Sequence, residues 1–101
     1  KKMYETIINN LAKPYFEKIL WCKGVILLPD FEDIHSYIFW KYVIYSICNK
    51  INFISNNKID FVPPSNRSIL TFIEKIKKKN YNKFYFKKNF TFENKNLYYI
   101  I

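Results

Sequence analysis

Hydrophobic and polar residues first recur with helical spacing in residues 4–20. Ile7, Ile8 and Leu11 fall on one face of a helix that begins at about Tyr4. Pro14 then lacks the amide N–H that a helix interior needs, so we expect the helix to break or kink there.

A second helix is predicted after Pro29. Asp30, Glu32 and Asp33 stand where the positive end of a helix dipole favours acids, so we expect the helix to begin with them. From Tyr37 to Cys48 it is apolar on nearly every side, which is typical of a centrally buried helix. Asn56 and Asn57 predict the loop that follows.

The third helical pattern has the clearest boundaries. Pro63 and Pro64 prevent an earlier start, and Ser65 is a natural N-cap. Asn80 can end the helix in a left-handed cap. The predicted core stripe comprises Ile69, Leu70, Phe72, Ile73 and Ile76, and the opposite side carries Lys75, Lys77, Lys78 and Lys79.

The pattern then changes to the alternation of strands. Residues 84–86 (FYF), 90–92 (FTF) and 97–101 (LYYII) are separated by polar turns, which predicts a hairpin or a three-strand meander. The aromatic residues should mostly pack against the helices: Phe84, Phe86, Phe90, Phe92, Tyr98 and Tyr99.

Residues 19–28 allow two interpretations. Two short apolar runs flank Lys23-Gly24, a potential tight turn, so a small hairpin can form there. The alternative is that the first helix continues to Trp21.

These elements predict one α+β domain over residues 1–101. It has a three-helix core, a small C-terminal β-hairpin or meander, and a possible short hairpin between the first two helices. The length of 101 residues suits one domain with a modest core.

Charge is distributed unevenly. Residues 51–101 contain 10 basic and 3 acidic side chains, and seven lysines lie between Lys75 and Lys88 without an acid. A patch of one sign attracts polyanions such as lipid headgroups or nucleic acids. The chain is also rich in Lys, Asn, Ile, Tyr and Phe, whose codons are AT-rich. An AT-rich genome is the simplest explanation of this composition, so the alternative is that the lysines form a solvated face.

Catalytic and metal chemistry find little support in the sequence. Cys22 and Cys48 are too few for a disulfide framework or a metal site, and we expect both to pack as small hydrophobic residues. His35 stands alone, and there is neither a glycine-rich phosphate loop nor a nucleophile elbow. We expect a protein that is not an enzyme and needs no cofactor or metal.

The most apolar segment, residues 34–54, is interrupted by Lys41, Asn49 and Lys50. A membrane span needs about 20 largely uncharged residues, so we do not expect one here. The chain begins with Lys and has no visible signal peptide, so we interpret it as a domain of a larger protein. We expect an intracellular location, cytoplasmic or peripheral to a membrane, with an organelle also open.

From Ser65 onward the chain resembles the DEP domain, a signalling module of winged-helix order. Residues 65–101 follow the family's last third: a capped helix, a short strand, Thr91-Phe92, a polar turn, and Tyr98-Tyr99 followed by an apolar residue. Asn80-Tyr81 replaces the usual Gly and apolar residue. Phe31 and Trp40 are candidates for an earlier Phe and Trp of the family, but their spacing is one residue off, and Glu32 stands where the family has Gly.

This resemblance implies recruitment to acidic membranes together with docking to a protein partner. Each lysine near an anionic leaflet contributes about 1 kcal/mol. The candidate membrane-binding lysines are Lys77, Lys78, Lys79, Lys83, Lys87 and Lys88, followed by Lys18 and Lys23, with Trp21 as a possible membrane anchor.

A second hypothesis is nucleic-acid binding by a winged helix, or by a subunit of an organellar ribonucleoprotein. The helix at 66–79 would enter the major groove, and the same lysines would contact phosphates. Arg67 is the only arginine, so residues suited to base recognition are scarce. A buried structural subunit of a larger assembly is a further alternative, and the oligomeric state is open.

Overall fold

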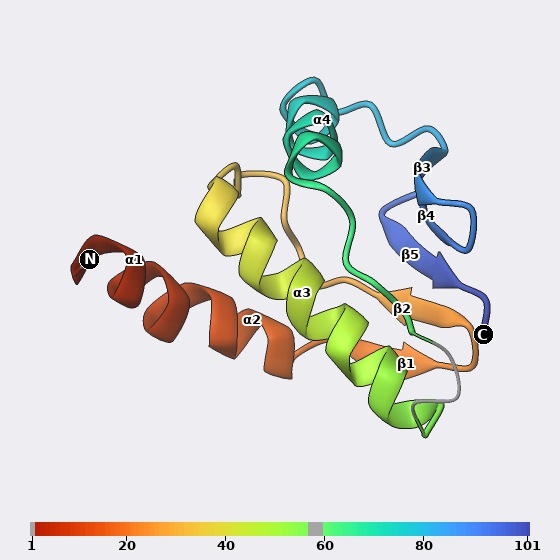
Figure 1. The fold of residues 1–101 in the computed structure, drawn as a ribbon. Coiled ribbons are helices and arrows are strands. Elements are labelled where there is room, and N and C mark those ends of the chain that lie inside the picture. Colours follow the sequence, from red (N-terminus) through yellow and green to blue (C-terminus); the bar gives the residue numbers. More distant parts are fainter. Residues whose placement is uncertain (1, 57–59) are drawn as a thin grey trace.

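The computed structural model describes residues 2–56 and 60–101, which form an α+β domain. Three helical segments pack on one face of a five-stranded antiparallel sheet with the strand order β1-β2-β5-β4-β3. Figure 1 shows α2 and α3 side by side, α4 at one extremity, and the C-terminus beside the β1–β2 turn.

The first helical segment continues through Pro14 instead of breaking. α1 (Lys2–Ile7) leads into a π-helical turn, η1 (Ile8–Ala12), and then into α2 (Lys13–Glu17). The Lys13 N–H donates to the Ile8 carbonyl, so the hydrogen bond spans five residues. This wider turn lies directly before Pro14, which lacks the N–H for a helical hydrogen bond. The expected irregularity at Pro14 is therefore a π-helical turn.

The second helix begins later than its acids suggested. α3 spans Tyr37–Ile54, and the Ser36 hydroxyl caps it by accepting a 3.2 Å hydrogen bond from the Phe39 N–H. Asp30, Glu32 and Asp33 lie in the preceding loop, so their assignment to the first turn was wrong. A capping hydroxyl satisfies an orphan N–H directly, and this bond fixes the start.

Every side chain of α3 from Tyr37 to Cys48 is buried or half-buried, as predicted for a central helix. After α3, Asn56 adopts a positive φ of 57°, consistent with the expected loop, whereas Asn57 lies outside the described residues.

The third helix, α4 (Asn66–Lys77), has the predicted N-cap. Ser65 accepts a 3.2 Å hydrogen bond from the Ser68 N–H. Its core stripe is buried at Ile69, Phe72, Ile73 and Ile76, but Leu70 is 51% exposed, so its inclusion in the stripe was wrong. Leu70 lies one residue beyond Ile69, about 100° around the helix, and therefore faces outward.

The end of α4 also differs from expectation by one residue. Lys79, not Asn80, adopts the left-handed conformation, with φ 53°. The Asn80 N–H donates to the Lys75 carbonyl and the Lys79 N–H to the Ile76 carbonyl, both at 2.9 Å. This hydrogen-bond pattern is a Schellman motif with a lysine at the position that glycine favours.

Replacing Lys79 by glycine should therefore stabilise the fold. Relief of the left-handed strain is partly offset by the larger backbone entropy of glycine in the unfolded chain, so we expect a gain of about 0.5–1 kcal/mol. Urea unfolding followed by circular dichroism measures the change. Lys78→Gly is the matched control, because Lys78 has a negative φ of −87° and glycine there should be neutral or destabilising.

The β-structure is larger than a C-terminal hairpin or meander. β3 (Phe84–Lys87), β4 (Phe90–Glu93) and β5 (Asn96–Tyr99) form the predicted meander. The hairpin between the first two helices also forms, from β1 (Leu20–Cys22) and β2 (Val25–Leu27), and Gly24 has a φ of 78° in its turn. β2 pairs with β5 through Ile26 and Leu97, which joins both hairpins in one sheet.

Candidate anion-binding surfaces

The predicted lysines lie on two separate parts of the molecule. The first group, which we call the α4 end, comprises Lys77, Lys78, Lys79 and Lys83, all of which are exposed. The Schellman motif places the first three where the carbonyl end of the helix dipole favours cations. Glu74 lies 3.7 Å from the Lys77 ammonium, but both side chains are at least half exposed, so this ion pair neutralises little.

Lys83 belongs to this group through the start of β3. Its ammonium lies 5.1 Å from the centroid of the Tyr85 ring. A side-chain hydrogen bond with Tyr85 raises the pKa of Lys83, and Glu93 adds a smaller attraction in the same direction. Lys75 lies above the Phe84 ring, 6.0 Å from its centroid, and so connects α4 to β3.

Lys87 and Lys88 lie at the other end of β3. Lys87 is half-buried next to a β-bulge, and Lys88 is exposed in the β3–β4 turn. The carbonyl of Asn89, in the same turn, accepts a 3.0 Å hydrogen bond from the Ile100 N–H. Lys83 and Lys88 are close in sequence, but they lie at opposite ends of β3.

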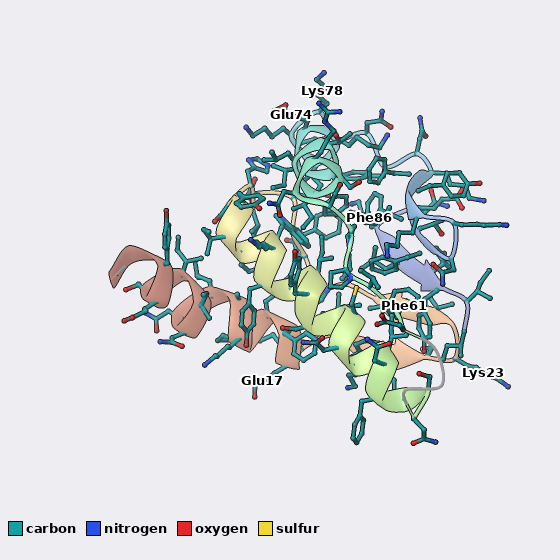
Figure 2. The ribbon with its side chains drawn as sticks, in the orientation of Figure 1. Glu17, Lys23, Phe61, Glu74, Lys78 and Phe86 are labelled. Atoms are coloured by element: carbon teal, nitrogen blue, oxygen red, sulfur yellow. The ribbon has the colours of Figure 1, made fainter. Side chains whose placement is uncertain are left out.

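Lys23 lies in the β1–β2 turn, and Lys18 directly follows α2; both are exposed. Figure 2 shows Lys23 and Lys78 at opposite extremities of the molecule. The eight candidate lysines therefore do not form one continuous patch. The α4 end is one basic region, and the end that carries the β1–β2 and β3–β4 turns is another.

Trp21, the possible membrane anchor, is half-buried. Its ring lies 6.5 Å from that of Phe16 and 6.3 Å from that of Tyr99, both edge to face. The Lys50 ammonium lies 4.6 Å from the centroid of the indole. The Trp21 ring therefore packs against core aromatic rings and also lies beside the Lys50 ammonium. This arrangement suits an interface between apolar and aqueous surroundings.

The sequence interpretation missed several exposed apolar residues at the end of α3 and at the C-terminus. Phe53 is 79% exposed, Ile100 70% and Ile101 57%. Two signals pointed to them: Phe53 falls outside the buried stripe that ends at Ile51, and Ile100-Ile101 breaks the alternation of the last strand. Lys50 was missed because it is isolated among apolar residues.

Glu32, in the loop after β2, accepts a 2.5 Å hydrogen bond from Lys95, and this bond raises the pKa of Lys95. Among residues 2–56 and 60–101, no group of three or more His, Cys, Asp or Glu side chains could hold a metal ion. In the same residues, no helix is both long enough and apolar enough to cross a membrane.

The two cysteines have different environments. Cys48 is buried, and burial raises the pKa of its thiol to about 12. Cys22 is exposed on β1, so the expectation that it packs like Cys48 was wrong. In the β1 ladder Cys22 alternates with Trp21 and therefore points to the opposite face of the sheet from that core-packed indole.

We accordingly expect one thiol to react quickly with Ellman's reagent in the folded chain and two after denaturation, because the thiolate is the reactive species. Cys22→Ser should remove the fast phase, whereas Cys48→Ala should leave it intact. A fast reaction that persists in Cys22→Ser would show that Cys48 is accessible.

Comparisons of the chain with family models, with curated proteins and with solved structures found no match.

Proposed function

We propose that this chain is a non-catalytic domain that is recruited to anionic membranes through its basic surface and docks to a protein partner. The observation that carries this proposal is the exposure of lysines with few carboxylate partners. Of the eight candidate lysines, all in the described part of the chain, Lys77 is the one in an ion pair, and its partner Glu74 is well exposed. Cations that are not neutralised within the fold remain available to a polyanion.

The expected strength follows from simple electrostatics. At about 1 kcal/mol for each lysine near an anionic leaflet, three aligned lysines contribute roughly 3 kcal/mol. That is about a hundredfold in affinity and suits reversible recruitment. The attraction is screened over about 8 Å at physiological ionic strength, so only lysines on the contacting face contribute.

The resemblance to the DEP domain supports this proposal. The chain has a helix, a β-hairpin, two further helices and then strands, which is the order of that family. The first hairpin is part of the sheet through the pairing of β2 with β5. A winged-helix arrangement of the DEP type is thus part of the proposal, as is a peripheral membrane location.

Nucleic-acid binding is the alternative that α4 favours. Arg67 and Thr71 are exposed on this helix, as a recognition helix requires. However, Thr71 donates to the Arg67 carbonyl at 3.0 Å, and Glu74 occupies the next turn, where it would repel phosphates. These contacts make α4 a poorer match to a major groove than the lysines alone suggest.

Co-sedimentation with lipid vesicles tests the proposed function. We expect binding to vesicles of phosphatidylcholine and phosphatidylserine, little binding to phosphatidylcholine alone, and no displacement by duplex DNA or by RNA at physiological salt. Displacement by nucleic acid, or tight nucleic-acid binding without vesicle binding, would favour the alternative. Failure to bind any of them would contradict both.

A further inference from the structure

Exposed apolar side chains converge where the β1–β2 turn meets the ends of α3 and β5. Trp21, Ile54, Ile100 and Ile101 line a cleft of about 620 Å³ there. Ile54 is 45% exposed, Ile100 70% and Ile101 57%. We call these four residues the apolar tip. Soluble domains rarely expose large apolar side chains in such a cluster unless they bind something.

Lysines surround the apolar tip. Lys23 lines the same cleft, and the Lys50 ammonium lies 4.6 Å from the centroid of the Trp21 ring. Lys88 precedes Asn89, whose carbonyl accepts the Ile100 N–H. Three cations from three different elements thus border one apolar surface.

Most acids lie elsewhere. Glu32 binds Lys95 at the β4–β5 turn, the end of β5 opposite Ile100. Glu17 ends α2, and Figure 2 shows it well apart from Lys23. Asp60 is exposed and precedes Phe61, whose N–H donates to Asn52 of α3, and it does not line the cleft. The surface around the tip is therefore mainly cationic.

We propose that the apolar tip enters the headgroup region of an anionic bilayer while Lys23, Lys50 and Lys88 contact lipid phosphates. Apolar side chains surrounded by cations, with a tryptophan at the boundary, match the layered chemistry of such a surface. A second copy of this chain is a poor match, because its lysines would face like charges across the interface.

This inference rests on the proposed function and assigns the end of the domain that faces the membrane. It differs from the expectation based on sequence, which favoured Lys77–Lys79. The α4 end offers cations without a comparable apolar cluster, and Lys78 lies at the opposite extremity from Lys23 (Figure 2). A flat bilayer on the apolar tip leaves the α4 end beyond the screening distance of about 8 Å.

Cys22 provides a probe beside the tip, since it borders the same cleft from the sheet face opposite Trp21 and Cys48 is buried. An environment-sensitive fluorophore on Cys22 should brighten and shift to the blue on vesicles that contain an equal mixture of phosphatidylcholine and phosphatidylserine. The matched control carries the fluorophore at Lys78→Cys in a Cys22→Ser background. We expect no shift there, although that protein should still sediment with the vesicles. A larger response at position 78 than at Cys22 overturns the assignment.

Two variants separate the assignment from the function. Ile100→Ser with Ile101→Ser removes exposed apolar surface of the tip and should weaken vesicle binding by about tenfold or more. Lys77→Gln with Lys78→Gln and Lys79→Gln should change binding by no more than about twofold. Circular dichroism confirms that both variants fold.

If the wild-type chain binds no anionic vesicles, the proposed function and the assignment fail together. If it binds and the triple glutamine variant at Lys77, Lys78 and Lys79 loses as much affinity as the double serine variant, or more, the function stands and the assignment is wrong. If the serine variant binds as tightly as the wild type, the apolar tip does not enter the bilayer.

Discussion

Replacing Trp40 by alanine should lower the free energy of unfolding by about 3–5 kcal/mol. Trp40 is completely buried, and its ring lies 5.1 Å from those of Phe39 and Phe72 and 5.7 Å from that of Phe31. Its indole N–H donates to the Ile34 carbonyl at 2.7 Å. The substitution therefore leaves a large cavity and an unpaired carbonyl where α3, α4 and the loop after β2 meet.

The loss should be a large fraction of the total, because small domains have about 5–15 kcal/mol of stability. Urea unfolding followed by far-ultraviolet circular dichroism measures it without depending on the fluorescence of the removed residue. Trp40→Phe keeps an aromatic ring but lacks the indole N–H, so we expect a smaller loss than with alanine.

The other tryptophan provides a matched control. Trp21 is half-buried, so Trp21→Ala should cost about 1–2 kcal/mol, since less apolar surface leaves the interior. Equal losses at the two positions would mean that Trp40 does not hold the centre of the core.

The sequence predicted best the elements that local signals define. The start of α4 is identified by Pro63, Pro64 and Ser65 because their effects are local. The prolines lack an N–H, and the serine accepts a hydrogen bond from the first turn. The aromatic alternation of β3, β4 and β5 reports a buried face directly, and buried Phe90 and Phe92 confirm it. Short turns join these strands, so their pairing follows from their order.

Features that depend on distant contacts were not predictable from local patterns. β2 pairs with β5, which lies at the other end of the chain, and no residue in either strand specifies that partner. The acids Asp30, Glu32 and Asp33 suggested an earlier start for α3, but the hydrogen bond from the Phe39 N–H to the Ser36 hydroxyl fixes it. Lys79 took the left-handed position because α4 ends at Lys77 and is capped by Lys78, which makes Lys79 the first residue after the cap.

The candidate site was predictable in residue type but not in arrangement. Lysines between 75 and 88 are adjacent in sequence, yet β3 extends about 3.3 Å per residue and separates Lys83 from Lys88. Conversely, Trp21, Ile54 and Ile100 are far apart in sequence and meet in one cleft. Clusters along a chain therefore indicated the chemistry, and only the fold showed which charges lie together.

Asn52 should rank next to Trp40 in its effect on stability. Its side chain binds the backbone of Phe61 twice: Oδ1 accepts from the Phe61 N–H at 2.6 Å, and Nδ2 donates to the Phe61 carbonyl at 3.2 Å. Phe61 is 2% exposed, and its ring packs 5.4 Å from that of Phe90. One side chain of α3 thus fixes the segment before α4 against the sheet.

Asn52→Ala should cost about 2–3 kcal/mol, because it leaves a donor and an acceptor unpaired beside a buried ring. Asn52→Asp keeps the acceptor for the Phe61 N–H and should cost less. Asn49→Ala is the control, since Asn49 is exposed on the same helix and its loss should be close to zero. Urea unfolding gives the three values, and amide hydrogen exchange at Phe61 should accelerate in Asn52→Ala alone. If Asn52→Ala and Asn49→Ala are equally stable, the double hydrogen bond does not hold this segment, and the packing of Phe61 against Phe90 does.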